Sequence, residues 1–392
     1  MKKPTSMTRR DFFRALTVSA AAVALPGCDA RMPFGPSGSD ESLDRGSGVT
    51  VKDFSTAHGI VPPMITPFLN TPGKEIDWAV FDAVIEFHIA RGVSGVFIVC
   101  GSGEMFELTE DEAVAMASRA VSVAAGRINI LCGSSIHMNY SKDMYYGGDN
   151  NNIAAYEADR DANIAMTQRI GATGVAGCVI NIPQVVPQSY AADIDNKMLD
   201  YFTAVHDGTS YPLFGYELPG NVHGYKYSST VFAAMGAMPR YIGIKDTTCD
   251  VAKVQAKIDA AGGTIMVMDA NTANLYRTLT IGATGGINTT ANVAPNLYAK
   301  LYEYAMAGNF AKSMGLMSYI NLIDGKLGYG YMRSVKVALG MMGVPITSAC
   351  RLDKPDFGIA EIMNLSDMIK LIKEAEEMYD AKPVSVSGWR EA

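Results

Sequence analysis

The feature that most constrains the fold is a regular alternation of short apolar runs with longer amphipathic stretches, which begins near residue 58. Short apolar runs bounded by turn residues are typical of buried strands, and the longer stretches are typical of helices packed against them. Eight strands are expected, in chain order Ile60–Thr66, Gly95–Cys100, Ile128–Cys132, Val175–Ile180, Pro212–Tyr216, Ile242–Lys245, Thr264–Met268 and Gly285–Asn288. Strands that alternate with helices indicate the α/β class with a parallel sheet.

The stretches between these strands predict helices. The clearest are Asp77–Arg91, Thr109–Ala125, Ile153–Ile170, Ala191–His206 and Thr230–Met238. Thr109 stands three residues before Glu112, which is the spacing of a capping box at a helix start. Eight strand-then-helix units in roughly 245 residues have the size and order of a (β/α)8 barrel, the TIM barrel. A doubly wound open sheet is the alternative, but its glycine fingerprint GxGxxG is missing after the first strand.

Composition divides the chain into four parts. Residues 1–28 resemble an export signal, residues 29–57 form a linker, residues 58–307 hold the predicted barrel and residues 308–392 form a C-terminal helical extension. The linker is rich in Gly, Ser, Pro and Asp and buries too little apolar surface to fold alone. The clearest helices of the extension are Phe310–Ile323, Met332–Met341 and Ala360–Tyr379.

The first 28 residues predict export. An apolar run from Ala15 to Leu25 follows several basic residues and is too short to span a bilayer, but it has the length of a signal-peptide core. The segment "TRRDFFR" resembles a twin-arginine export motif, and "LPGC", which ends at Cys28, resembles a lipoprotein processing box. We therefore expect a periplasmic or otherwise extracytoplasmic protein, with Cys28 as the candidate lipidation site and its lipid as the only link to a membrane.

Net charge and cysteine spacing argue against a nucleic-acid-binding, zinc-binding or disulfide-rich protein. The chain has 33 basic and 40 acidic residues, a net charge of −7, and no basic stripe that would follow a nucleic acid. Five cysteines remain beside Cys28, and their wide spacing predicts neither a zinc site nor a disulfide framework: Cys100, Cys132, Cys178, Cys249 and Cys350. We expect no nucleic-acid partner and no metal. The long polar segment from His137 to Asn152 is either an active-site loop or a surface elaboration.

A lysine closes one of the predicted buried strands, in the segment "YIGIKDTTCD". The carboxyl ends of barrel strands meet at the mouth where active sites form, so Lys245 would be partly desolvated there. Desolvation lowers the pKa of an amine and favours the neutral form that attacks a carbonyl. The alternative is a lysine that reaches out to solvent. Tyr216 ends the neighbouring predicted strand, where its phenol is either a proton carrier or a core aromatic.

Two further strand ends carry candidate substrate-binding residues. The turn "CGSGE" after the second predicted strand offers the backbone amides of Gly101, Ser102 and Gly103 to a carboxylate. Asn288, at the end of the eighth predicted strand, is the other candidate.

Together these segments resemble the dihydrodipicolinate synthase/N-acetylneuraminate lyase family. The family's Schiff-base lysine segment "(I/V)GIKD(S/T)" is matched by "IGIKDT", and its "YNxP" tyrosine turn by "YELP". Its GTTGE or GSTGE turn with a following helix start is matched by "CGSGEMFELTEDE". The segments "GATGGINTTANVAP" and "TPF" resemble the family's eighth and first strand ends, and the resemblance covers about residues 58 to 355.

The resemblance implies a class I aldolase that needs no cofactor and forms a homotetramer. It assigns the Schiff base to Lys245, acid–base chemistry to Tyr216 and a catalytic hydroxyl to Ser102. Its substrates would be a small 2-oxo acid such as pyruvate and an aldehyde.

Three departures from the synthase pattern bear on the substrate. Gly101 stands where the synthases have a hydroxyl residue, Val185 where they have a relay tyrosine, and Asn221 where they have a carboxylate-binding arginine. These changes, together with export, favour a catabolic aldolase over dihydrodipicolinate synthesis.

Besides dihydrodipicolinate synthesis itself, two alternatives remain open from the sequence. One is a Schiff-base dehydratase or hydratase-aldolase that acts on a sugar acid or an aromatic pyruvate derivative; Gln184 is a further changed position that motivates it. The other is a non-catalytic exported binding protein on the same fold, because a fold does not dictate a function.

Overall fold

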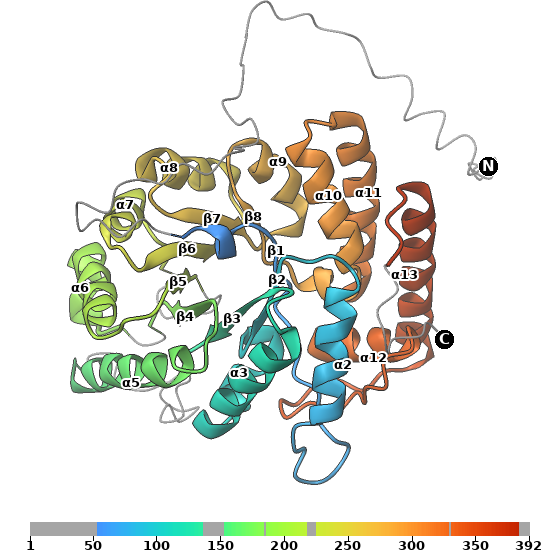
Figure 1. Ribbon diagram of the computed structural model, residues 1–392, viewed down its shortest axis with the longest axis horizontal. Coiled ribbons are helices and arrows are strands. Elements are labelled where there is room, and N and C mark those ends of the chain that lie inside the picture. Colours follow the sequence, from blue (N-terminus) through green and yellow to red (C-terminus); the bar gives the residue numbers. More distant parts are fainter. Residues whose placement is uncertain (1–52, 136–152, 184–185, 218–224, 329–330, 384–392) are drawn as a thin grey trace, which may run out of the picture. The chain divides into compact units, whose positions relative to one another are not determined.

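The computed structural model describes residues 53–135, 153–183, 186–217, 225–328 and 331–383. In this part of the chain eight strands form one parallel sheet, in the order β1-β8-β7-β6-β5-β4-β3-β2. The strands are β1 (Gly59–Ile60), β2 (Gly95–Ile98), β3 (Asn129–Gly133), β4 (Gly177–Asn181), β5 (Leu213–Tyr216), β6 (Tyr241–Asp246), β7 (Met266–Asp269) and β8 (Gly285–Gly286). Figure 1 shows them curled into a barrel inside a ring of helices. The predicted (β/α)8 barrel is confirmed.

The barrel closes between β1 and β2 through a short irregular segment. The amide of Phe97 donates to Pro62 O at 2.9 Å, and the amide of Met64 donates to Phe97 O at 2.8 Å. Our expectation of a first strand at Ile60–Thr66 was wrong in length. Pro62 and Pro63 have no N–H to donate, so the regular ladder ends at Ile60.

Helices follow the strands around the barrel. They are α2 (Trp78–Ile89), α3 (Glu110–Ala124), α5 (Ile153–Gly171), α6 (Ile194–Asp207), α7 (Ser229–Ala237), α8 (Val251–Ala261), α9 (Leu275–Thr280) and α10 (Pro295–Met306). The predicted capping box is confirmed: Thr109 Oγ1 accepts from the amide of Glu112 at 3.1 Å, and Glu112 Oε2 accepts from the amide of Thr109 at 2.9 Å. The helix expected at Ala191–His206 begins later, after the 3-10 helix η4 (Gln188–Asp193).

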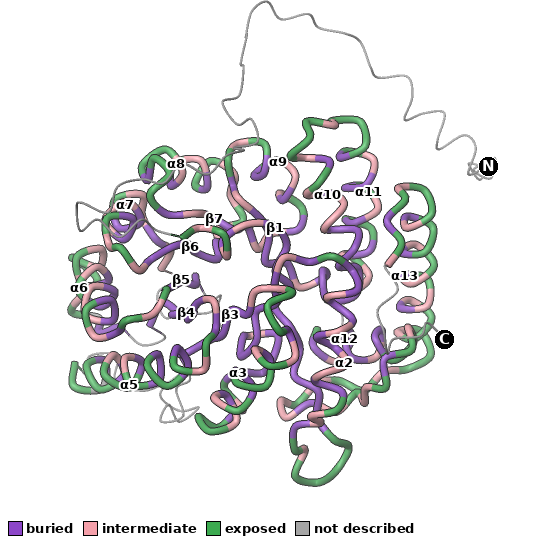
Figure 2. The backbone as a smooth tube through the Cα atoms, viewed as in Figure 1, coloured by how far each residue is buried: buried purple, intermediate pink, exposed green. Residues whose placement is uncertain are grey.

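The strands are buried on both faces. Figure 2 shows them in purple, with the exposed green positions on the outer sides of the helices. The apolar cluster inside the barrel contains Ala57, Val61, Phe97, Cys100, Leu131, Val179, Phe214, Tyr216, Ile242, Met268 and Ile287. A second and larger cluster fills the space between strands and helices. This double burial explains why the strands read as continuous apolar runs in the sequence.

The folded part begins before the boundary that we placed at residue 58. The 3-10 helix η1 (Ser55–Ala57) lies at the start of β1, and Ala57 is completely buried in the inner cluster. Thr284 Oγ1 donates to Ala57 O at 2.6 Å. The last residues of the expected linker therefore belong to the barrel.

The C-terminal extension contains α11 (Phe310–Leu327), α12 (Met332–Met341) and α13 (Ile359–Met378), close to the three helices predicted there. A buried ion pair ties it to the barrel: Lys336 Nζ on α12 lies 2.8 Å from Glu104 Oε1, and both side chains are fully buried. Glu104 Oε2 also accepts from the amide of Leu352 at 2.9 Å. Arg351 adds two bonds of 2.6 and 2.7 Å to the carboxylate of Glu112.

The described residues contain neither a membrane-spanning helix nor a cluster of metal ligands. None of their helices has the length and apolar character needed to cross a bilayer. Nor do they contain a group of three or more His, Cys, Asp or Glu side chains placed to hold a metal ion.

Several expectations concern residues outside the described part. The signal segment with Cys28, the linker up to residue 52 and the polar segment from His137 to Asn152 lie there. So do Gln184, Val185 and Asn221.

We expect the substitution Lys336→Met to lower the free energy of unfolding by about 3–5 kcal/mol, because it leaves the carboxylate of Glu104 buried without its cation. Denaturant unfolding at neutral pH measures this loss. The control is Lys370→Met on α13, whose side chain is 69% exposed and pairs with Asp367; its effect should stay within about 0.5 kcal/mol. Equal effects of the two substitutions would contradict the anchoring role of the buried pair.

Candidate active site

Lys245 and Tyr216 end neighbouring strands and meet inside the barrel mouth. The two residues are register partners between β5 and β6. Lys245 Nζ donates to Tyr216 Oη at 3.2 Å, and the residues are only 6% and 4% exposed. The structure therefore brings together the two residues that the sequence placed at adjacent strand ends.

The surroundings of this pair change its acid–base properties. Burial lowers the pKa of Lys245 to about 8, with the thiol of Cys100 acting weakly in the opposite direction. Burial also raises the pKa of Tyr216 well above its usual value. The ring of Tyr216 packs edge-on against Phe97, with ring centroids 5.7 Å apart. At pH 7 about a tenth of Lys245 is thus in the neutral form that can act as a nucleophile, while Tyr216 keeps its proton.

A second buried lysine holds the two strand ends together. Lys257 Nζ on α8 lies 2.6 Å from Glu217 Oε1 and 2.6 Å from Asp246 Oδ2, and all three side chains are at most 2% exposed. Glu217 directly follows Tyr216, and Asp246 directly follows Lys245. We call this group the Lys257 clamp. It links the residues next to both members of the reacting pair.

Hydrogen bonds complete the Lys257 clamp. Glu217 accepts from the amides of Tyr227 and Thr247, each at 2.9 Å. Asp246 Oδ1 accepts from the amide and the hydroxyl of Thr248, at 2.8 and 2.6 Å. Burial raises the pKa of Glu217, and the ammonium of Lys257 acts against that rise. A buried group of charges is tolerated only where each charge has such partners.

The turn after β2 lies beside the reacting pair. Gly101, Ser102 and Gly103 form the 3-10 helix η2 (Gly101–Gly103), and Ser102 is 3% exposed. The amide of Gly103 donates to Cys100 O at 2.9 Å, so it is already used inside the turn. The amides of Gly101 and Ser102 begin the turn, where helical amides have no partner within the helix. A side chain at Gly103 would bring a Cβ within 2.9 Å of Met64 O, which explains the glycine there.

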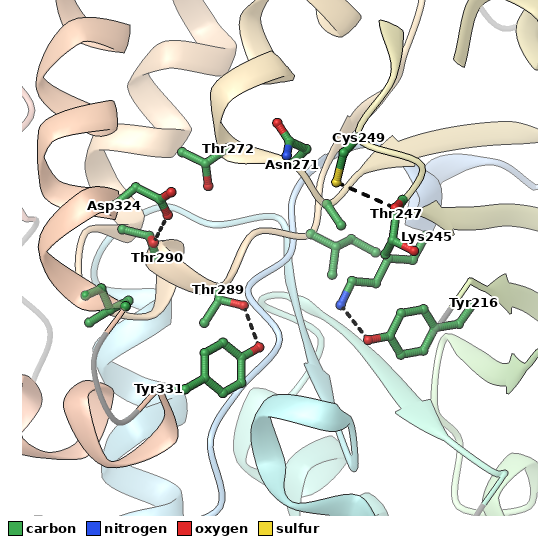
Figure 3. Close-up of a pocket in the computed structure, with 14 residues that line it drawn as sticks. Tyr216, Lys245, Thr247, Cys249, Asn271, Thr272, Thr289, Thr290, Asp324 and Tyr331 are labelled. Atoms are coloured by element: carbon green, nitrogen blue, oxygen red, sulfur yellow. Dashed lines mark hydrogen bonds between the residues drawn. The ribbon is translucent and has the colours of Figure 1, made fainter. Parts of the chain in front are cut away.

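A pocket of about 430 Å³ opens over Lys245 and Tyr216. Its other lining residues are Thr247, Cys249, Ala270, Asn271, Thr272, Ile287, Thr289, Thr290, Asp324, Leu327, Gly328 and Tyr331. They come from β6, from the 3-10 helices η6 (Thr272–Asn274) and η7 (Thr289–Asn292) or the residues beside them, and from the C-terminal extension. Figure 3 shows Lys245 and Tyr216 on one side, with Asp324, Thr290 and Tyr331 on the other.

Tyr331 is the most prominent residue that the sequence did not indicate. Its Oη lies 2.9 Å from Ser102 Oγ and 3.0 Å from Thr289 Oγ1. Its φ of 42° is in the left-handed region, which is uncommon for a residue with a bulky side chain. The glycine-rich segment "GKLGYGY" that contains it gave no sign that its phenol would enter the barrel mouth.

Asn288 does not line this pocket. It is completely buried, and neither atom of its side-chain amide has a hydrogen-bond partner among the described residues. Its neighbour Thr289 points into the pocket instead. Gly101, Ser102 and Gly103 are also outside the lining, and Ser102 reaches it through Tyr331.

The lowered pKa of Lys245 predicts how stability depends on pH. The pKa is about 8 in the folded chain against an ordinary value of 10.5, so the unfolded chain binds more protons between these values. The contribution of Lys245 to the free energy of unfolding should therefore rise by up to about 3 kcal/mol from pH 8 to 10.5. Urea unfolding of the native chain and of Lys245→Met at pH 7.5 and 9.5 measures the difference. Parallel pH dependences of the two proteins would contradict the lowered pKa.

The sequence matches a known family over most of the described part. The family model described as "Dihydrodipicolinate synthetase family" matches residues 56–137 and 157–372. A curated relative, the 4-hydroxy-tetrahydrodipicolinate synthase of Ruegeria pomeroyi, is 28% identical over 256 residues, which cover 65% of this chain and 78% of that protein.

Solved structures share the fold. A dihydrodipicolinate synthase from Bacillus anthracis has a TM-score of 0.68 at 22% identity, over 82% of this chain and 99% of that one. A catalytic-lysine mutant of a Ruminococcus gnavus sialic acid aldolase has a TM-score of 0.69 at 17% identity, over 84% and 100% of the two chains. Because the family model covers more than half of the chain, the protein belongs to the dihydrodipicolinate synthetase family and is an enzyme of the lyase class, a class I aldolase.

Proposed function

We propose that this enzyme makes or cleaves a carbon–carbon bond between pyruvate, or a similar 2-oxo acid, and an aldehyde, through a Schiff base on Lys245. The observation that carries the proposal is the buried Lys245–Tyr216 pair at the base of a pocket, with the pKa of the amine lowered to about 8. A neutral amine and a protonated phenol in contact are the two groups that imine formation requires.

The chemistry follows from these two side chains. The neutral Nζ of Lys245 attacks the C2 carbonyl of the 2-oxo acid and forms a carbinolamine. Tyr216 gives its proton to the carbinolamine hydroxyl, which leaves as water, and the C=N bond forms. The resulting phenolate is a strong base, because burial raises the pKa of Tyr216. In the cleavage direction it takes the proton of the substrate hydroxyl while the electron pair of the breaking C–C bond moves into the iminium.

The substrate carboxylate is assigned to the turn η2. In this proposal the amides of Gly101 and Ser102 donate to it, and the hydroxyl of Ser102 keeps the tyrosine Tyr331 in place. The imine is the electron sink, so the scheme requires no metal or organic cofactor.

The proposal also includes where the enzyme acts and how it assembles. The motifs of residues 1–28 support export and a lipid anchor at Cys28, and an exported enzyme of this type would act in catabolism. A homotetramer is supported by the family resemblance alone.

A dehydratase or hydratase-aldolase is the second candidate. The second phenol in the pocket, Tyr331, favours it, because loss of a substrate hydroxyl as water needs an additional proton donor. Analysis of the products formed from a 3-deoxy-2-oxo sugar acid separates the two: pyruvate with an aldehyde indicates cleavage, whereas a dehydrated acid of unchanged carbon number indicates dehydration.

Borohydride reduction in the presence of pyruvate tests the Schiff base. We expect a single covalent adduct by intact mass, located at Lys245 by peptide analysis, and none in Lys245→Ala. The substitution Tyr216→Phe should slow adduct formation by about 10²–10⁴-fold, because it removes the proton carrier.

Lys226 provides the matched control. It is a half-buried lysine near the pocket whose pKa is also lowered by burial, and its Nζ donates to Thr247 Oγ1 at 3.0 Å. The substitution Lys226→Met should leave the adduct intact. A folded protein that forms no adduct with pyruvate or with any longer 2-oxo acid would refute the proposal and favour a non-catalytic binding protein.

A further inference from the structure

The pocket wall that faces the reacting pair has no role in the Schiff-base scheme. It presents hydroxyls from Thr272, Thr289, Thr290 and Tyr331, together with the amide of Asn271 and the carboxylate of Asp324. We call this surface the polar wall. Among the described lining residues, Lys245 is the only cation and Asp324 the only anion.

Tyr331 is the member of the polar wall that carries a phenol. Figure 3 shows its phenol pointing toward Tyr216 and Lys245 from across the pocket. The hydroxyls of Ser102 and Thr289 flank its Oη at 2.9 and 3.0 Å. A phenol oxygen held by two neighbouring hydroxyls can donate or accept as a ligand requires.

Asp324 lies in the same wall, across the pocket from Lys245 (Figure 3). It comes from α11, and one of its carboxylate oxygens accepts the hydroxyl proton of Thr290. Its other oxygen is an acceptor for a ligand hydroxyl, whereas a ligand carboxylate beside it would be repelled. In the imine complex the Nζ of Lys245 is bonded to the 2-oxo acid, so the described wall contributes no further cation to balance a second carboxylate.

We propose that the polar wall is the subsite for the aldehyde-derived part of the substrate, and that it selects an uncharged fragment with two or more hydroxyl groups. Tyr331 binds the oxygen closest to the reacting carbon, and Asp324 binds a hydroxyl farther along the chain. Both are specificity-determining residues, and both are supplied by the C-terminal extension. The assignment of the fragment rests on the proposed aldolase function.

A binding experiment tests the polar wall without catalysis. The Lys245→Met protein cannot form an imine, and calorimetry measures its affinity for two six-carbon 2-oxo acids. One, 2-oxo-3-deoxygluconate, ends in a hydroxylated tail, and the other, 2-oxoadipate, ends in a carboxylate. We expect the hydroxylated acid to bind at least about tenfold more tightly, because a carboxylate would meet Asp324 without a counterion.

Substitutions in the wall then identify the residues responsible. In the Lys245→Met background, Tyr331→Phe and Asp324→Asn should each lower the affinity for the hydroxylated acid by about tenfold. Asp324→Lys should reverse the preference toward 2-oxoadipate. The controls Tyr319→Phe on α11 and Asp367→Asn on α13 lie outside the pocket lining and should change neither affinity.

Catalysis separates this inference from the proposed function. With Lys245 intact, Asp324→Asn should trap pyruvate with borohydride as the native chain does. Both Asp324→Asn and Tyr331→Phe should lose about tenfold in kcat/KM for condensation with glyceraldehyde, and Asp324→Asn should lose little with propanal. If the native chain traps neither pyruvate nor any longer 2-oxo acid, the Schiff-base proposal is refuted. The relative affinities for the two six-carbon acids still test the polar wall in that case. Normal trapping with equal affinities for the two acids, or a preference for 2-oxoadipate, overturns the polar wall as a hydroxyl-selective subsite.

Discussion

The geometry of the site depends on one buried ammonium, that of Lys257. Its contacts of 2.6 Å with Glu217 and Asp246 fix the residues that follow Tyr216 and Lys245, so α8 sets the spacing of the reacting pair. Without this cation two carboxylates would be buried side by side, which is strongly unfavourable. The hydrogen bonds from neighbouring amides make the arrangement tolerable and leave little freedom for the two strand ends to slip.

The alternation of side chains along a strand keeps this charged clamp from interfering with the chemistry. Successive residues of a strand point to opposite faces, so Lys245 enters the barrel while Asp246 faces α8. In the same way, Tyr216 points into the barrel and Glu217 points toward α8. The amine of Lys245 therefore lies against the rings of Tyr216 and Phe97, and no carboxylate of the described residues pairs with it. One face of the two strands is charged, and the other holds an amine whose pKa is lowered by burial.

The barrel and the reacting pair were predictable because they leave periodic or terminal signals in the sequence. Lys245 and Tyr216 stand directly after apolar runs, and position at a strand end is all that the barrel needs to bring them together. Lys257 was not predictable, since a lysine on an amphipathic helix normally faces water. Tyr331 and Asp324 follow no strand and reach the mouth only through the packing of the extension. Asn288 does not line the pocket, because the chain turns into η7 at this point and Thr289 lines the pocket in its place.

The pocket is shared between two stretches of the chain that lie far apart in sequence. Lys245 and Tyr216, the proposed nucleophile and proton carrier, belong to β6 and β5, whereas Asp324 and Tyr331 belong to a segment that begins after the eighth barrel helix. In evolutionary terms, mutation or exchange of the last part of the gene can reshape what the pocket accepts while the bond-forming residues stay unchanged. Such a division would separate the inheritance of reactivity from that of selectivity.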